Sequence, residues 1–281
     1  MAYITDTWET IAENCAKGFA KTLYKLGDLK TITINWGNTT EDIDMEIIGF
    51  SHDDKSDGTG KAAITFFSKQ LLSTNRQLST ANSNSGGWAG SSLRSWCNST
   101  LFNALPADLQ AAIAEVKKWS DGGQNSTALV ETNDKCWLAS IDEVYHWNGD
   151  NTVPGQGARY PQSTVHDSGL NGKWFIKAKA NGTAYAWWLR TAATNSTNWK
   201  YVSNQTWGCG EDRGTSSLAI AFGFCVGVVS AVSAVDSEEY LITGTRCIQI
   251  ADQVRRIRGI TTALTPAQIV SELAQVPDAT T

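Results

Sequence analysis

The sequence predicts an α+β domain followed by a small helical C-terminal tail. Residues 7–24 repeat apolar side chains at the three- and four-residue spacing of a helix, whereas residues 29–36 (LKTITINW) alternate apolar and polar side chains as a half-buried strand does. The composition changes near Asp236, where strand-like apolar sequence gives way to amphipathic segments. We therefore expect a main domain over residues 1–236 and a tail over residues 237–281.

The first half of the main domain is expected to contain strands and then helices. Further strands are predicted at residues 44–50 and 61–67, and the Asn-, Ser- and Gly-rich residues 75–90 indicate a loop. Ser140 and Glu143 have the spacing of a capping box, which marks the start of a short helix. The helices predicted after the loop are residues 93–102, 107–119 and 140–145.

The second half is expected to be rich in short strands and loops. The predicted strands are residues 135–138, 173–179 and 185–190, with closing strands inside residues 217–235. The predicted loops are residues 148–172 and 191–214, which show no sustained apolar period. The tail contains two amphipathic segments, residues 248–258 and 267–276, and it is too small to bury a core by itself.

Composition excludes several classes of partner. The net charge is -5, which argues against nucleic acid, since phosphate binding needs clustered Lys and Arg, and against an anionic membrane surface. No apolar run approaches the roughly 18 residues of a membrane span, so no membrane insertion is expected. Residues 1–10 lack the apolar stretch of a signal peptide. The six Cys form no CxxC pair, and we expect free buried thiols in a protein made in a reducing cytoplasm.

The sequence contains no recognisable catalytic set, and we expect a protein that is not an enzyme and needs no cofactor. Nucleophile-elbow, P-loop and GxGxxG motifs are all absent. A weak metal candidate remains in the loop HDDKSDG, where His52, Asp53 and Asp57 carry suitable ligand atoms. A calcium loop counted from Asp53 would need an acid at its twelfth position, where Ile64 stands. The alternative is a turn whose carboxylates accept backbone N–H bonds.

Tryptophan is abundant, with 12 residues, and its distribution suggests two roles. One set falls in apolar motifs and is predicted to be core: Trp8, Trp88, Trp96, Trp137, Trp187 and Trp188. Beyond Arg190, aromatic rings are separated by small polar residues, as in antibody-like binding surfaces. An ordinary surface loop remains the alternative. The candidate ligand-binding residues are Thr194, Asn195, Asn198, Trp199, Tyr201, Asn204, Trp207 and Arg213.

Several motifs together resemble a domain of unknown function that is common in bacteriophage and prophage structural genes of gut bacteria. They are GDLKTITI, IIGFSHDDKSDGTGKAAITF, GGWAGSSLRSWCNSTLFNALPADLQAAI, DKCWLASIDEVY, YAWWLR and AIAFGFCV, between about residues 8 and 228. In that family the closing strand has the form G(V/F)RPAF, whereas AFGFCV stands here without the Arg-Pro pair.

The resemblance implies a C-type-lectin-like fold, similar to that of the formylglycine-generating enzymes. Some proteins of this fold are the variable proteins of diversity-generating retroelements, in which substitutions gather on a ligand-binding face. Residues 191–213 stand where such a variable region would lie. No Cys pair matches the copper chemistry of the formylglycine enzymes.

The tail, including YLITGTRCIQIADQVRRIRG, resembles a short module of phage tail and tail-fibre proteins. These resemblances imply a tail-associated receptor-binding protein of the virion, with a cell-surface protein or glycan as ligand and other tail proteins as partners. A homo-oligomer is left open. The first alternative is a purely structural virion assembly protein without its own host ligand. The second is a carbohydrate-active or oxidative enzyme on the same fold.

Overall fold

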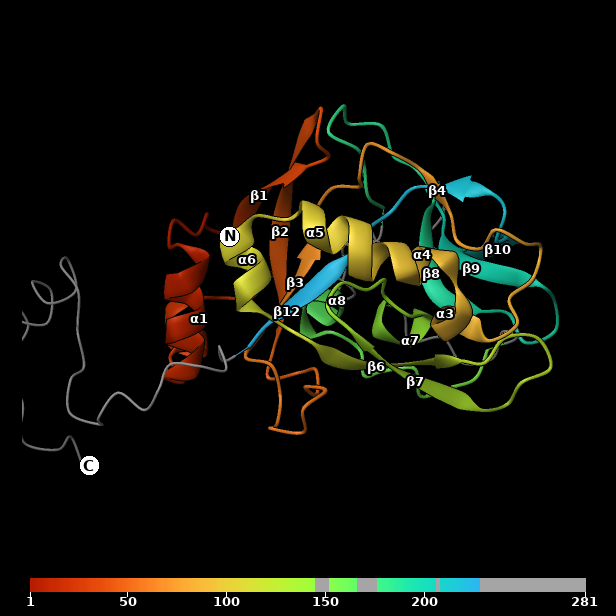
Figure 1. Ribbon diagram of the computed structural model, residues 1–281, viewed down its shortest axis with the longest axis horizontal. Coiled ribbons are helices and arrows are strands. Elements are labelled where there is room, and N and C mark those ends of the chain that lie inside the picture. The colour runs from red at the N-terminus through yellow and green to blue at the C-terminus, as the bar shows by residue number, and fades with distance from the viewer. Residues whose placement is uncertain (145–151, 166–175, 206–207, 228–281) are drawn as a thin grey trace, which may run out of the picture. The chain divides into compact units, whose positions relative to one another are not determined.

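The computed structural model describes residues 1–144, 152–165, 176–205 and 208–227. These residues fall within the first of two compact units of the chain, Met1–Ser230. They combine helices with mostly antiparallel strands, which confirms the α+β class (Figure 1). The predicted tail helices and the boundary at Asp236 lie outside the described residues. None of the described helices has the length and apolarity needed to cross a lipid bilayer.

A five-stranded antiparallel sheet organises the domain, in the order β1-β2-β3-β12-β5. Its strands are β1 Leu29–Asn35, β2 Thr40–Phe50, β3 Ile64–Ser68, β12 Gly223–Val226 and β5 Ile113–Ala114. The three strands predicted first along the chain are confirmed, although β2 begins earlier than expected. The last described strand, β12, inserts between β3 and β5 and so pairs with segments far earlier in the chain.

The N-terminal helical region packs an aromatic residue onto this sheet. Helix α1 (Trp8–Ala16) begins where Thr7 accepts a hydrogen bond from the backbone N–H of Thr10, at 3.1 Å. Trp8 makes edge contacts with Phe66 of β3, and its ring centroid lies 5.2 Å from that of Phe66. The single helix predicted over residues 7–24 is wrong in one respect: Gly18, at φ +75°, separates α1 from α2 (Ala20–Leu23).

A chain of short helices follows the predicted loop. They are α3 Gly87–Gly90, α4 Ser92–Trp96, the π-helical turn η1 Cys97–Leu101, α5 Phe102–Ala104 and α6 Ala107–Ala112. Ser91 caps α4 by accepting a hydrogen bond from the N–H of Arg94 at 3.1 Å. The helix predicted over residues 93–102 is therefore present, with a π-helical turn in its second half.

The helix predicted over residues 107–119 is wrong beyond Ala112. Strand β6 (Val116–Asp121) pairs antiparallel with β7 (Leu129–Asp134), a strand that the sequence patterns did not predict. Val116, Lys118 and Ser120 alternate toward the interior, which is a strand period. The spacing of apolar side chains in residues 107–119 is compatible with a helix or with a strand. The antiparallel pairing with β7 makes residues 116–121 a strand.

A second sheet, ordered β10-β9-β8, replaces most of the loop predicted over residues 191–214. Its strands are β8 Trp187–Ala192, β9 Asn198–Val202 and β10 Cys209–Arg213. The strand predicted at residues 185–190 is confirmed as β8. Beside it, β4 (Arg76–Gln77) pairs with β11 (Ser217–Leu218).

Other predicted elements are reduced or replaced. Helix α7 (Ile141–Val144) is confirmed, and α8 (Pro161–Val165) lies inside residues 148–172, where only a loop was expected. Residues 135–138 form no strand of their own and contribute one bridge, from Trp137 to Gly223. Within residues 173–179, the described part contributes one bridge at Ala178.

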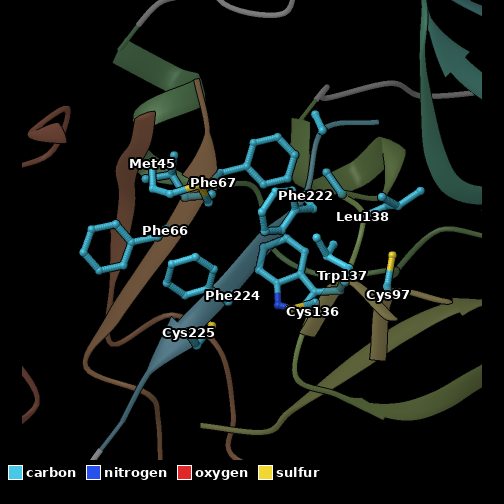
Figure 2. Close-up of a cluster of buried hydrophobic side chains, with 14 of the residues drawn as sticks. Met45, Phe66, Phe67, Cys97, Cys136, Trp137, Leu138, Phe222, Phe224 and Cys225 are labelled. Carbon is cyan, nitrogen blue, oxygen red and sulfur yellow. The ribbon is translucent and has the colours of Figure 1, made fainter. Parts of the chain in front are cut away.

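Aromatic side chains from the central sheet fill the core (Figure 2). Phe66 of β3 stacks on Phe224 of β12, with ring centroids 5.5 Å apart. A side chain at Gly223 would meet the ring of Trp137 at 2.6 Å, which explains the glycine there. The predicted core tryptophans are buried except Trp96, which is half-buried. The free thiols expected from the sequence are confirmed for the described cysteines, four of which are buried.

Candidate functional site

Four charged side chains from distant parts of the chain meet inside the domain, and we call them the ionic core. Asp53 follows β2, Lys118 lies on β6, Glu143 on α7 and Arg190 on β8. The Lys118 Nζ lies 2.5 Å from Asp53 Oδ1 and 3.1 Å from Glu143 Oε1. The Arg190 Nη1 lies 2.5 Å from Glu143 Oε2. Two cations thus face two carboxylates, and the cluster has no net charge.

Local structure places Glu143 in this cluster. The backbone N–H of Glu143 donates to Ser140 Oγ at 3.2 Å, and the N–H of Ser140 donates to Glu143 Oε2 at 3.0 Å. This is the capping box that the sequence predicts. Gly157, at φ +121°, passes so close that a Cβ there would lie 2.8 Å from Glu143 Oε1. The carboxylate therefore serves as a helix cap and as an ion-pair partner.

Neutral groups complete the hydrogen bonding of the other carboxylate. The hydroxyl of Tyr160 donates to Asp53 Oδ1 at 2.9 Å, and the hydroxyl of Thr65 donates to Asp53 Oδ2 at 2.6 Å. The Nδ1 of His52 lies 3.6 Å from Asp53 Oδ1. Lys118 also sits over the Trp137 ring, with its Nζ 3.5 Å from the centroid. Every charge is thus matched by an opposite charge and by hydrogen bonds, as buried ions require.

Mutual attraction keeps these groups ionised in spite of burial. Burial raises the pKa of Asp53, but the charges of Lys118 and His52 outweigh it and hold that pKa well below its usual value. Burial likewise raises the pKa of Glu143, and Arg190 and Lys118 lower it further than burial raises it. Burial lowers the pKa of Lys118, while the two carboxylates raise it above the usual value. A group held in one charge state is poorly suited to exchange protons near neutral pH.

Arg190, from the WWLR motif, joins three parts of the domain. Its guanidinium donates to the carbonyls of Leu138 and Gln156, both at 2.7 Å, and to that of Trp119 at 3.2 and 3.3 Å. Together with the pair to Glu143, these bonds use the donors of the guanidinium within the protein. The ionic core is therefore framework that fixes β8 against β6 and α7.

A small pocket of about 220 Å³ opens above the ionic core. His52, Lys61, Lys117 and Trp119 line its outer part. Trp119 is 41% exposed, which is unusual for a large apolar side chain. The charged atoms of the ionic core at this pocket already face partners, whereas the Nδ1 of His52 makes no hydrogen bond.

The three metal candidates do not form a ligand set. His52 and Asp53 lie together, but Asp53 is engaged by Lys118. Asp57 is exposed and accepts hydrogen bonds from the N–H and hydroxyl of Thr59, at 2.9 and 2.7 Å. Within the described ranges no three His, Cys, Asp or Glu side chains are grouped as a metal site would require. Asp57 thus accepts a backbone N–H bond as the alternative interpretation expects, whereas Asp53 bonds to side chains of the ionic core.

The predicted ligand-binding residues divide by exposure. Asn195 and Arg213 are exposed, whereas Thr194, Asn198, Tyr201 and Asn204 are half-buried. Trp199 was expected to be an exposed anchor, and this is wrong: it is 1% exposed and donates its Nε1 hydrogen to the carbonyl of Ser83 at 3.4 Å. A ring buried by neighbouring segments cannot present its face to a ligand. Trp207 lies outside the described residues.

A buried asparagine that no sequence pattern singled out holds the turn between β8 and β9. The Nδ2 of Asn84 lies 2.8, 3.0 and 2.7 Å from the carbonyl oxygens of Ala193, Ser196 and Asn198. Its Oδ1 accepts from the N–H of Gln124 at 2.9 Å. The N–H of Asn125 donates to the carbonyl of Thr194 at 2.9 Å. Asn84 stands in a Ser-, Asn- and Gly-rich loop, where composition alone marks no single residue.

Comparison with known proteins yields one family. Residues 63–216 match the family described as a domain of unknown function (DUF6273), and this match covers more than half of the chain. It includes β3, the ionic-core residues Lys118, Glu143 and Arg190, and the second sheet. No curated protein matches the chain, and no solved structure does.

Proposed function

The chain belongs to the DUF6273 family, a domain family of unknown function, and on this premise we propose that it is a ligand-binding protein of a phage or prophage tail. Its binding surface is formed by the exposed and half-exposed residues between Thr194 and Arg213. The protein acts by surface complementarity and carries out no reaction. The ligand is a protein or glycan on the surface of the host cell.

One observation carries the proposal: hydrogen bonds from neighbouring segments and a buried ring hold the turn between β8 and β9 in place. Asn84 bonds three of its carbonyls, Asn125 bonds a fourth, and the buried ring of Trp199 anchors the following strand. Polar side chains on a turn fixed in this way lose little conformational freedom when they bind a ligand. A turn held by these buried contacts can accept substitutions of its exposed side chains without losing its shape. This supports a role in recognition.

Two parts of the proposal, the C-type-lectin-like fold and the diversification of the binding face, rest on the motif resemblance. A C-type-lectin-like domain would combine a framework sheet with a variable face near its last strands, and the WWLR strand β8 directly precedes the candidate surface. Diversification by a retroelement would alter this face. A reverse-transcriptase gene beside this one, together with a near-copy of codons 185–225 that differs at adenines, would support this part. Neighbouring DNA that lacks both would contradict it.

The binding role is tested with the labelled full-length chain and a panel of intact gut bacteria. The double variant Asn195→Ala/Arg213→Ala removes an amide and a cation from the candidate surface, where both are exposed. The matched control, Asn38→Ala/Lys17→Ala, also removes one amide and one cation, from exposed sites elsewhere in the chain. We expect the first variant to lose at least ten-fold in cell binding and the control to bind like the parent, with all melting temperatures within about 2 °C.

Two outcomes would contradict the proposal. Equal cell binding by both variants would remove the candidate surface from recognition. A closed oligomer that buries residues 194–213 would favour a purely structural virion protein, and this is measured by light scattering with cross-linking between copies.

A further inference from the structure

A second pocket, of about 430 Å³, lies between β4, α4 and β11. Its polar lining comes from Asn75, Arg76, Gln77, Thr80, Ser92 and Trp96. The volume is within the range of about 300–1,000 Å³ that is usual for small-molecule sites. Helix α4 packs beside β4, as Figure 1 shows, so the walls belong to paired and packed elements.

Arg76 provides a cation with a fixed plane at this pocket. Its guanidinium carbon lies 4.0 Å from the centroid of the Trp96 ring, and Trp96 in turn stacks on Trp36 with centroids 5.9 Å apart. Among the residues that the structure describes, no carboxylate pairs with this guanidinium. A stacked guanidinium keeps its N–H edge available, and this edge matches a carboxylate with two parallel hydrogen bonds.

Two further polar atoms at the pocket walls lack partners. Asn75 Oδ1 and Trp96 Nε1 are shielded from bulk solvent, and neither makes a hydrogen bond in the structure. Such orphaned groups are costly, because a buried donor or acceptor loses its bonds to water. One is an acceptor and the other a donor. Because both atoms have almost no accessible surface, a ligand in the pocket contacts instead the exposed side chains of Gln77, Thr80 and Ser92.

We propose that this pocket binds an acidic sugar, a hydroxylated ring that carries one carboxylate. The carboxylate pairs with Arg76, and the ring hydroxyls donate to the Oε1 of Gln77 and the Oγ of Ser92 and bond to the hydroxyl of Thr80. An amide hydrogen of Gln77 and the hydroxyl hydrogen of Ser92 already bond to backbone carbonyls. This site is separate from the candidate surface of the proposed function, because Arg213 and Asn195 do not line it. It would recognise its ligand whether or not residues 194–213 bind the host cell.

The test is a calorimetric titration of the full-length chain with glucuronic acid, with glucose as the neutral counterpart and inorganic phosphate as a second anion. We expect glucuronic acid to bind at least ten-fold more tightly than either. Arg76→Gln removes the charge and should weaken glucuronic acid binding at least ten-fold, whereas Arg76→Lys keeps the charge without the planar fork and should weaken it less. Lys21→Gln, which removes an exposed cation outside the pocket and outside residues 194–213, should bind like the parent.

A second variant guards against misfolding of the first. Asn75→Asp keeps the size of the side chain and places a like charge beside the carboxylate, so it should also abolish glucuronic acid binding. Each variant must retain the parent's cooperative melting transition. The proposal is overturned if glucuronic acid does not bind at millimolar concentration, if glucose or phosphate binds equally well, or if Lys21→Gln rather than Arg76→Gln loses binding.

Discussion

Replacing Lys118 with Met should destabilise the protein by about 3–5 kcal/mol, the cost of leaving a buried charge without its partner. Lys118 contacts both carboxylates of the ionic core, at 2.5 and 3.1 Å. Glu143 would keep Arg190, but Asp53 would keep only neutral partners and the nearby His52. Met fills a similar volume, so the loss is mainly electrostatic and not a cavity.

The assay is urea unfolding of the parent, of Lys118→Met and of Lys118→Met/Asp53→Asn, followed by tryptophan fluorescence. The double variant removes the stranded charge and should recover at least about 1 kcal/mol relative to Lys118→Met, by the logic of a double-mutant cycle. A loss below about 1 kcal/mol for Lys118→Met, or no recovery in the double variant, would refute the view that Lys118 neutralises Asp53.

The pH dependence of Lys118→Met gives an independent check. In the parent, the folded pKa of Asp53 is below its unfolded value, so the stabilisation is present above about pH 4 and is lost as the pH falls through the folded pKa. Without Lys118, burial dominates and the folded pKa should rise above the unfolded value. The deficit of the variant should then shrink between pH 7 and pH 5, whereas a purely steric defect would stay constant.

Three other predictions follow from single contacts. Trp199→Ala should lower the free energy of unfolding by about 3–5 kcal/mol, measured with urea, because the ring is buried. An unchanged urea midpoint would contradict this burial and indicate a surface residue. Asn84→Ala should cost about 1–3 kcal/mol and speed amide exchange of the turn that it holds, and unaltered exchange there would contradict the role of Asn84. Burial raises the pKa of Asp121 to about 7, so its contribution to stability is present at acid pH and is lost as the pH rises through about 7. Asp121→Asn should therefore flatten the stability profile between about pH 4 and pH 7, and a profile as steep as the parent's would exclude Asp121 as the titrating group.

Local patterns determined the parts of this protein whose stabilising partners are near in sequence. The alternation of residues 29–36 gave β1, and the spacing of Ser140 and Glu143 gave the cap of α7. The apolar setting of the WWLR motif correctly indicated buried tryptophans in β8. In each case the period or the cap acts within a few residues, so one sequence contains the whole signal.

Tertiary structure decided the parts whose partners are far away. Lys118 fell in a predicted helix because its apolar neighbours suit a helical period, yet pairing with β7 makes it a strand residue that faces Asp53. Trp199 stands in a polar segment, and only the packing of distant residues such as Ser83 shows that it is buried.

The abundance of tryptophan and the lack of catalytic motifs follow from the sequence alone. Some features depend on contacts between residues 25 to 142 positions apart, such as Lys118 with Glu143 or Asn75 with Ser217. These features are which tryptophans support the frame, which charges cancel inside it, and which polar side chains remain at the surface. Composition and local period contain no record of those contacts, because burial and charge pairing exist only once the chain has folded.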